Sequence, residues 1–222
     1  MQVLIDNGWM LICVTTGLFL FLGLILRLQS RQFCTLDVVV RRFSIMDLEF
    51  PASPRELTNI INGIYQLPSN RSEKTLRFVK AHLYTDFLFM PFAYGSIFIA
   101  CIKVSEKMYS FGHIVFVALA WLQILAWLLD VVENIYLLNK LKPTAIPSQE
   151  SVHKAYQTLQ VVKWGIALTG AICSLSALLY YWLIGNYATN SLTYLVILVI
   201  EVAAVFVAAK LIKKNKIQEE CD

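Results

Sequence analysis

The sequence predicts an all-α membrane protein, a bundle of five transmembrane helices with a short amphipathic helix on the cytoplasmic side. Of its 222 residues, 58% are hydrophobic and 15% are charged, whereas soluble domains have roughly 45–50% and about 25%. The mean hydropathy is +0.61. Several separate stretches reach the roughly 20 mostly apolar residues that a spanning helix needs. This composition argues against a water-soluble globule, a disordered chain and a nucleic-acid-binding protein.

The chain reads as a single membrane domain over residues 1–222, with apolar stretches separated by polar segments. The second and third stretches carry acidic residues and fit the pattern less cleanly than the others. The predicted spans lie at about 9–26, 83–102, 112–138, 162–184 and 192–209.

The basic residues predict the orientation of the chain. Lys and Arg gather between the first two spans, between the third and fourth, and after the fifth, while the opposite side holds only Lys103 and Lys107. Because cytoplasmic loops carry the excess of Lys and Arg, we expect the N-terminus outside and the C-terminus in the cytoplasm. Basic residues follow the first apolar run rather than precede it, which is typical of a signal anchor and not of a cleaved signal peptide.

The polar segment 28–80 contains a predicted helix. Ser53 is placed as its N-cap, Pro54 in its first turn and Glu56 three residues after the cap. An apolar stripe at helical spacing follows, made of Leu57, Ile60, Ile61 and Ile64. This helix could lie flat on the inner leaflet or pack on the ends of the spanning helices. Residues 43–50 alternate loosely, as a strand or a loop, and helix resumes at Ser72 ahead of the second span.

The five cysteines give no sign of a disulfide framework or a zinc site, because none belongs to a CxxC pair. Cys34 and Cys221 fall on the predicted cytoplasmic side. We expect the thiols to be reduced or buried.

Acidic residues inside the spans are the chemical feature of this chain. Each costs roughly 2.5–3.5 kcal/mol in the bilayer centre on the insertion scale, so each should face the bundle interior. A short loop that contains Met108 joins the second and third spans. Asp86 lies as many residues before Met108 as Asp130 lies after it. At a rise of about 1.5 Å per residue, these two carboxylates reach the same depth. Glu201 in the fifth span could reach a similar level.

Neighbouring residues extend this pair to a candidate site. His82 and Asp86 are spaced i, i+4, and Trp127, Asp130 and Asn134 continue one face of the third span. Pro91 frees a backbone carbonyl beside Asp86. The predicted ligand-binding residues are His82, Asp86, Tyr94, Trp127, Asp130, Glu133 and Asn134.

Several interpretations of this cluster stay open. Carboxylates at one depth cannot all ionise in a dry site, so at least one should hold a proton. The cluster could simply bind the helices together. Our functional hypothesis is that it binds a lipid-like or small amphiphilic ligand, or a protein partner. The alternative is a membrane-embedded acid–base enzyme, of isomerase or lipid-modifying type, using Asp86, Asp130 or Glu133.

Other chemistries find less support in the sequence. A metal site would have one nitrogen ligand, His82, which is poor for most transition metals. No nucleotide-binding or hydrolase motif occurs, so we predict no cofactor. Proton-linked transport usually involves internal repeats, which are not evident here.

The predicted partners are membrane lipids, whose anionic headgroups would meet the basic residues before the second span. Small residues recur along the fourth and fifth spans and would allow close helix packing. They indicate internal packing or a homo-oligomer contact. We expect no nucleic-acid partner.

The segments Asp47–Phe50, Asp86–Pro91 with Tyr94, and Leu129–Asn134 occur in this order. They resemble a group of small bacterial inner-membrane proteins with DLEF, DFLF-P-Y and LDxxEN segments, and the resemblance covers about residues 43–138. That group has no assigned activity. The resemblance implies a bacterial inner membrane and a single site that contains Asp86, Asp130, Glu133 and Asn134.

The outline of the cluster is also similar to the sterol-isomerase and sigma-receptor superfamily. Its isomerases place a His four residues before a carboxylate and a second carboxylate on the next helix, as His82, Asp86 and Asp130 do. This chain departs from that pattern by having five spans rather than four, Asp in place of Glu at both positions, and no later Asn-x-x-Trp. The likeness is an analogy of architecture.

Overall fold

The computed structural model describes residues 7–188 and 190–214, and 81% of these residues are helical. Five helices within this described part are long and apolar enough to cross a membrane, so the prediction of an all-α chain with five such helices is confirmed. They are α2 (Gly8–Gln29), α5 (Ser69–Ser105), α6 (Phe111–Lys140), α7 (Glu150–Leu183) and α8 (Asn190–Lys214).

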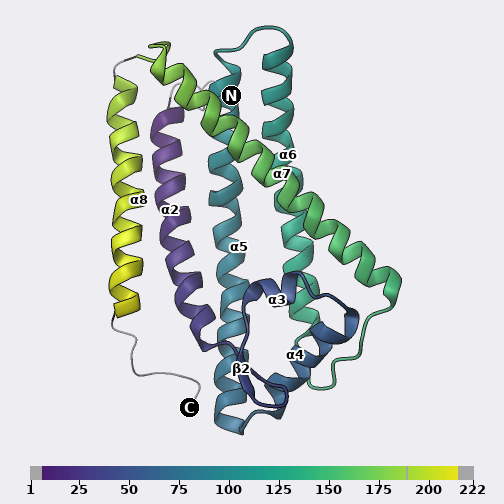
Figure 1. Cartoon of the computed structure of the whole chain (residues 1–222). Coiled ribbons are helices and arrows are strands. Elements are labelled where there is room, and N and C mark those ends of the chain that lie inside the picture. The colour runs from purple at the N-terminus through teal and green to yellow at the C-terminus, as the bar shows by residue number, and fades with distance from the viewer. Residues whose placement is uncertain (1–6, 189, 215–222) are drawn as a thin grey trace.

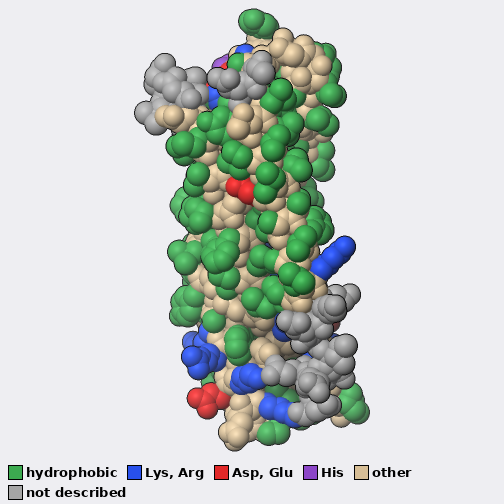
Figure 2. Space-filling view, turned by 90° about the vertical axis from the view of Figure 1, so that its left-hand side faces the viewer, with side chains coloured by type: hydrophobic (Ala, Val, Ile, Leu, Met, Phe, Trp, Pro, Cys, Tyr) green, Lys and Arg blue, Asp and Glu red, His purple; other side chains and the backbone are tan. Residues whose placement is uncertain are grey.

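The helices α8, α2, α5 and α6 stand side by side in that order, and α7 crosses α5 and α6 obliquely (Figure 1). On the face that carries α8, hydrophobic side chains cover the middle of the molecule and Lys and Arg gather toward the lower end (Figure 2). Both α5 and α7 begin well before the apolar stretches predicted for them, so their first turns extend beyond the spans.

The residues that link α2 to α5 form a small polar lobe at the lower end of the bundle, beside α5 and α6 (Figure 1). It starts with the short helix η1 (Ser30–Gln32) and an antiparallel hairpin, whose register pairs Cys34 with Arg42. We did not predict this hairpin, whose strands are β1 (Cys34–Leu36) and β2 (Val40–Arg42). The lobe continues with two helices, α3 (Ile45–Glu49) and α4 (Pro54–Gln66).

The helix α3 corrects our interpretation of residues 43–50 as a strand or a loop. Ser44 and Asp47 form a capping box, in which the Ser44 backbone N–H donates to Asp47 Oδ2 at 2.7 Å. Such a box satisfies N–H groups at a helix start that have no partner within the helix. The loose alternation of apolar residues masked this local signal.

The helix α4 begins as predicted, with the Ser53 hydroxyl accepting a hydrogen bond from the Glu56 backbone N–H at 3.2 Å. Its apolar stripe is buried in one core with residues of α5 and α6, such as Leu83 and Leu137. The helix therefore packs on the ends of the spanning helices instead of lying alone on a leaflet. A Cβ at Gly63 would lie 2.2 Å from the carbonyl oxygen of Leu36, so β1 passes too close for any other residue there.

The cysteines differ from our prediction at one position. Cys34 is disulfide-bonded, so the expectation of reduced thiols is wrong for this residue. Cys13, Cys101 and Cys173 are free, and Cys221 lies outside the described residues.

The small residues of the fourth span serve internal packing where they are buried. A Cβ at Gly170 would lie 2.2 Å from Gln123 Nε2, so α7 approaches α6 closely there. Ser174 is also buried. On α8, Ala203 and Ala204 are exposed, and a homo-oligomer contact through this helix stays a prediction.

Candidate functional site

The centre of the site is a buried ion-pair group between α6 and α7. Asp130 and Glu133 are three residues apart and therefore share a helix face. Lys163 of α7 lies between them, and its Nζ donates to Asp130 Oδ1 at 2.9 Å and to Glu133 Oε2. The Lys163 and Glu133 side chains are only 3% and 1% exposed. Charges this deeply buried persist in proteins because they are paired and hydrogen-bonded.

Hydrogen bonds join the helix α5 to the same group. Asn134 Nδ2 donates to Asp86 Oδ2 at 2.7 Å, and the Tyr94 hydroxyl donates to Asp130 Oδ2 at 2.8 Å. Asp86 is also within electrostatic range of Asp130 and Lys163. The structure thus brings together five of the seven predicted site residues. We call these five and Lys163 the carboxylate cluster: Asp86, Tyr94, Asp130, Glu133, Asn134 and Lys163.

The other two predicted residues occupy different positions. Trp127 packs on the apolar side of the cluster, in contact with the group that contains Met90 and Tyr94. The His82 ring stacks edge-on against Phe33 of the polar lobe, at 5.4 Å between ring centroids. His82 is therefore buried against the lobe rather than directed at Asp86.

Glu201 lies away from the cluster. Its Oε1 is 3.0 Å from the position that a Cβ would take on Gly17 of α2. Since α2 and α5 stand between α8 and α6 (Figure 1), Glu201 belongs to the α2–α8 contact.

The polar lobe adds a carboxyl group that we did not predict. Hydrogen bonds from α7 hold the end of α3 and the segment after it: the Tyr156 hydroxyl donates to the Leu48 carbonyl and Gln157 Nε2 to the Pro51 carbonyl, each at 3.2 Å. This attachment places Glu49 against the cluster, facing Glu133, Lys163, Asp130 and Asp86.

The protonation of Glu49 follows from this environment. Burial, and after it the negative charge of Glu133, raise the pKa of its carboxyl group to about 8 against the opposing charge of Lys163. Desolvation and like charges both disfavour the ionised form of an acid. Glu49 is therefore mainly protonated at neutral pH.

Beside the ion pairs lies a second group of polar atoms, which we call the Glu49–Glu133–Gln160 set. Glu49 Oε2, Glu133 Oε1 and both amide atoms of Gln160 are buried and have no hydrogen-bond partner among the described residues. Gln160 is 0% exposed, and its amide interacts with the side chains of Glu133 and Tyr156 without forming a well-aligned, short hydrogen bond to either. Each unsatisfied buried group costs about 1–3 kcal/mol, so native structures keep few of them. Such a set in one place indicates a position for a bound group.

Three residues of the site, Glu49, Gln160 and Lys163, were absent from our sequence-based prediction. Lys163 lies at the edge of the fourth predicted span, and in the sequence it counts only as one more basic residue near the predicted cytoplasmic side. A sequence signal did exist, since Tyr156, Gln160 and Lys163 recur at i, i+4 and i+7 and form a polar stripe. Glu49 lay within a segment whose helix we did not recognise.

The structure offers no obvious metal centre in the parts of the chain that it describes. No group of three or more His, Cys, Asp or Glu side chains is arranged there to hold a metal ion. Within the carboxylate cluster, Lys163 occupies the position between Asp130 and Glu133 that a cation would need.

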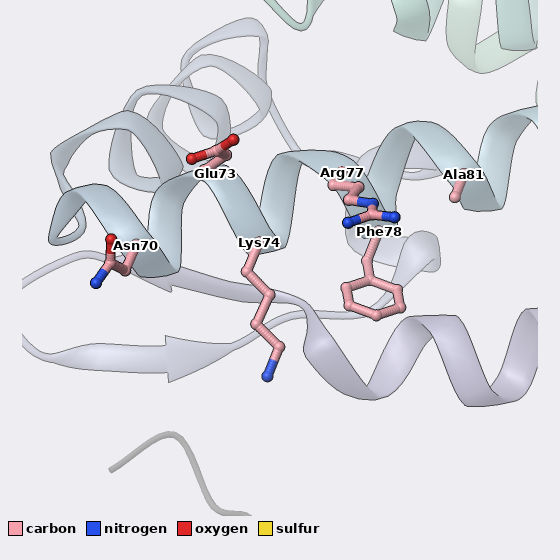
Figure 3. Close-up of a pocket in the computed structure, with 6 residues that line it drawn as sticks. All are labelled: Asn70, Glu73, Lys74, Arg77, Phe78 and Ala81. Atoms are coloured by element: carbon pink, nitrogen blue, oxygen red, sulfur yellow. The ribbon is translucent and has the colours of Figure 1, made fainter.

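A separate pocket of about 600 Å³ lies on the first turns of α5. In Figure 3 the Lys74 side chain extends away from the helix beside Phe78, and Arg77 lies one turn further on. The pocket is lined by Asn70, Glu73, Lys74, Arg77, Phe78 and Ala81.

Comparison with protein-family models, curated proteins and solved structures finds no match for this chain. The function must therefore be argued from the site itself.

Proposed function

We propose that this chain is a multi-pass protein of a bacterial inner membrane that binds a lipid-like or small amphiphilic molecule beside the carboxylate cluster. The observation that carries the proposal is the Glu49–Glu133–Gln160 set, whose buried polar atoms lack partners among the residues described. A bound polar group would satisfy them and remove the cost of leaving them unpaired.

The position of the set favours an amphiphilic ligand. Glu49 comes from the polar lobe, whereas Glu133 and Gln160 come from helices of spanning length. The outer faces of these helices are apolar, with Val132 and Val161 exposed. A molecule with a polar end and an apolar tail matches both surroundings, because its tail can stay in the lipid while its end reaches the set.

The orientation proposed from the basic residues places the lobe and the set on the cytoplasmic side. Lys74 and Arg77 of the α5 pocket would then lie at the inner leaflet, where each basic residue gains about 1 kcal/mol from anionic headgroups. This contact anchors the protein and is distinct from the ligand site.

Native mass spectrometry of the protein released from mild detergent tests this function. We expect wild-type protein to retain a co-purified amphiphile, and Gln160→Leu to lose it, because leucine removes two polar partners from the set. The control Glu150→Gln changes an exposed carboxylate at the start of α7 and should retain the ligand. Wild-type protein without a bound molecule, or equal retention by Gln160→Leu, would contradict the proposal.

A membrane-embedded acid–base enzyme is the second candidate. It is favoured by the position of Glu49, whose pKa is raised, beside Asp130 and Glu133, which are both paired with Lys163, since neighbouring carboxyl groups in different environments suit acid–base catalysis. Purified wild-type protein distinguishes the two candidates when it is incubated with the amphiphile extracted from membranes that contain the Gln160→Leu variant. An enzyme should convert this amphiphile, whereas a binding protein should return it unchanged.

A further inference from the structure

We propose that the polar end of the ligand is an ammonium group or a similar small cation, which binds between Glu49 of α3 and Glu133 of α6 and displaces a proton from this pair. This inference rests on the proposed function, since it names the chemical class of the molecule bound there.

The charges of the site favour a cation over other polar groups. Glu49 faces three further carboxyl groups, and Lys163 is the cation that faces it within the described part of the chain. Lys163 already donates to Asp130 and to Glu133 Oε2. The remaining negative charge must be neutralised by protons or by another cation, because isolated buried carboxylates are too costly to stay ionised.

The hydrogen-bonding atoms match the same class. An ionised carboxylate only accepts hydrogen bonds, and an ammonium group has three N–H donors. Glu49 Oε2, Glu133 Oε1 and Gln160 Oε1 are three acceptors without a short hydrogen bond among the residues described, and they come from α3, α6 and α7. The remaining atom of the set, the donor Gln160 Nε2, has the Glu133 carboxylate as a neighbour. An anionic end would add charge of the wrong sign, and a hydroxyl end would leave the excess charge uncompensated.

The exchange balances charge without any covalent step. Without a ligand, Glu49 holds a proton at neutral pH, since burial and the neighbouring carboxylates raise its pKa to about 8. A cation bound against it lowers that pKa, and the proton leaves to water. One positive charge enters and one leaves, so the net charge of the site is unchanged. The other titratable groups that face Glu49 are Asp86, Asp130, Glu133, Tyr156 and Lys163.

Calorimetry on the full chain in phosphatidylcholine nanodiscs tests this exchange. The probes are dodecylammonium, dodecanol and ethylammonium, and each titration is run in two buffers of different ionisation enthalpy to count protons. We expect dodecylammonium to bind at least about tenfold more tightly than dodecanol. It should release close to one proton at about pH 7 and fewer at about pH 9, where Glu49 is already ionised.

Variants locate the effect at the proposed position. Glu49→Gln should weaken dodecylammonium binding about tenfold and abolish the pH-dependent proton release, because the amide cannot ionise. The exposed control Glu150→Gln should leave both unchanged. If Glu49→Gln does not fold, the proton count of the wild-type protein decides alone.

The outcomes separate this inference from the proposed function. Equal affinity for dodecanol and dodecylammonium, or no proton release at about pH 7, would overturn the inference while a co-purified lipid still supported the function. Ethylammonium binding as tightly as dodecylammonium would support the cation and contradict the amphiphile.

Discussion

Lys163 of α7 donates to Asp130 of α6 at 2.9 Å, and both side chains are largely withdrawn from the surface of the molecule. The same ammonium group bonds Glu133, one helical turn away. This pairing makes α7 a partner of α6 through charge as well as through apolar contact. Most charged and polar groups of the carboxylate cluster therefore have partners within the protein. In this they differ from the Glu49–Glu133–Gln160 set.

Removing the central cation should destabilise the protein strongly. Lys163→Met leaves Asp130 and Glu133 buried without their partner, and breaking a buried ion pair from one side costs about 3–5 kcal/mol. Thermal unfolding in detergent measures the loss. Adding Asp130→Asn and Glu133→Gln to Lys163→Met should recover part of it, since no charge is then stranded. A single variant as stable as the wild type would show that the ion pairs do not form.

Asp86 and Asn134 should be energetically coupled. Asp86→Leu leaves the Asn134 amide without its acceptor, and Asn134→Leu leaves the carboxylate without its donor. Unfolding of both single variants and the double variant forms a cycle, in which contacting residues typically couple by about 0.5–3 kcal/mol. Asp86→Asn should be milder than Asp86→Leu because an amide keeps the shape and still accepts a hydrogen bond. Strictly additive losses would contradict the contact.

The stability of the protein should depend on pH through Glu49. Its pKa is raised in the folded chain from 4.5 to about 8, so its contribution to stability is fully present below about pH 4.5 and is lost as pH rises through about 8. We compare the unfolding temperatures of wild type and Glu49→Gln at about pH 6 and about pH 9. The wild type should lose more stability over this interval, because glutamine does not titrate. Equal losses would place Glu49 in water.

The membrane character of this chain could be predicted from composition and from apolar stretches long enough to span a bilayer. The depth argument for Asp86 and Asp130 also held in outline, because a short loop fixes the relative height of two antiparallel helices. What escaped prediction depends on contacts between distant segments. Glu49 joins the site only because α7 holds the α3 region through Tyr156 and Gln157.

Residue spacing within one helix gave wrong predictions for two side chains, because contacts with other segments determine where they lie. His82 and Asp86 share the spacing of a common face, yet the lobe residue Phe33 occupies the space beside His82. Glu201 faces α2 and not the cluster, because the spacing of residues along the chain does not predict the order of the helices in the bundle. Periodicity fixes faces within one helix, and it leaves open which neighbour each face meets.

The orientation of the chain is testable by cysteine labelling. In a background with the native cysteines replaced by serine, Ser151→Cys marks the exposed start of α7 and Tyr109→Cys marks the α5–α6 turn, where the tyrosine is 93% exposed. In intact cells a membrane-impermeant reagent should label position 109 and spare position 151 if the basic segments lie inside, as we propose. The reverse pattern would invert the topology and place the polar lobe outside.

Gln160 gives the sharpest separation between a structural and a ligand-binding role. In protein stripped of bound molecules, Gln160→Leu should be neutral or stabilising by up to about 1–3 kcal/mol, because leucine removes buried polar atoms that lack partners among the described side chains. The matched variant Gln123→Leu changes a buried glutamine on α6 whose amide donates to the Ile166 carbonyl at 3.2 Å, so it should destabilise. Unfolding temperatures before and after removal of lipid measure both effects. With the ligand present, the advantage of Gln160→Leu should disappear, because the wild-type amide then has a partner and bound ligand stabilises the folded state by mass action. A Gln160→Leu variant that is less stable than the wild type even without ligand would show that this amide is satisfied within the protein, and the binding site would have to be sought elsewhere.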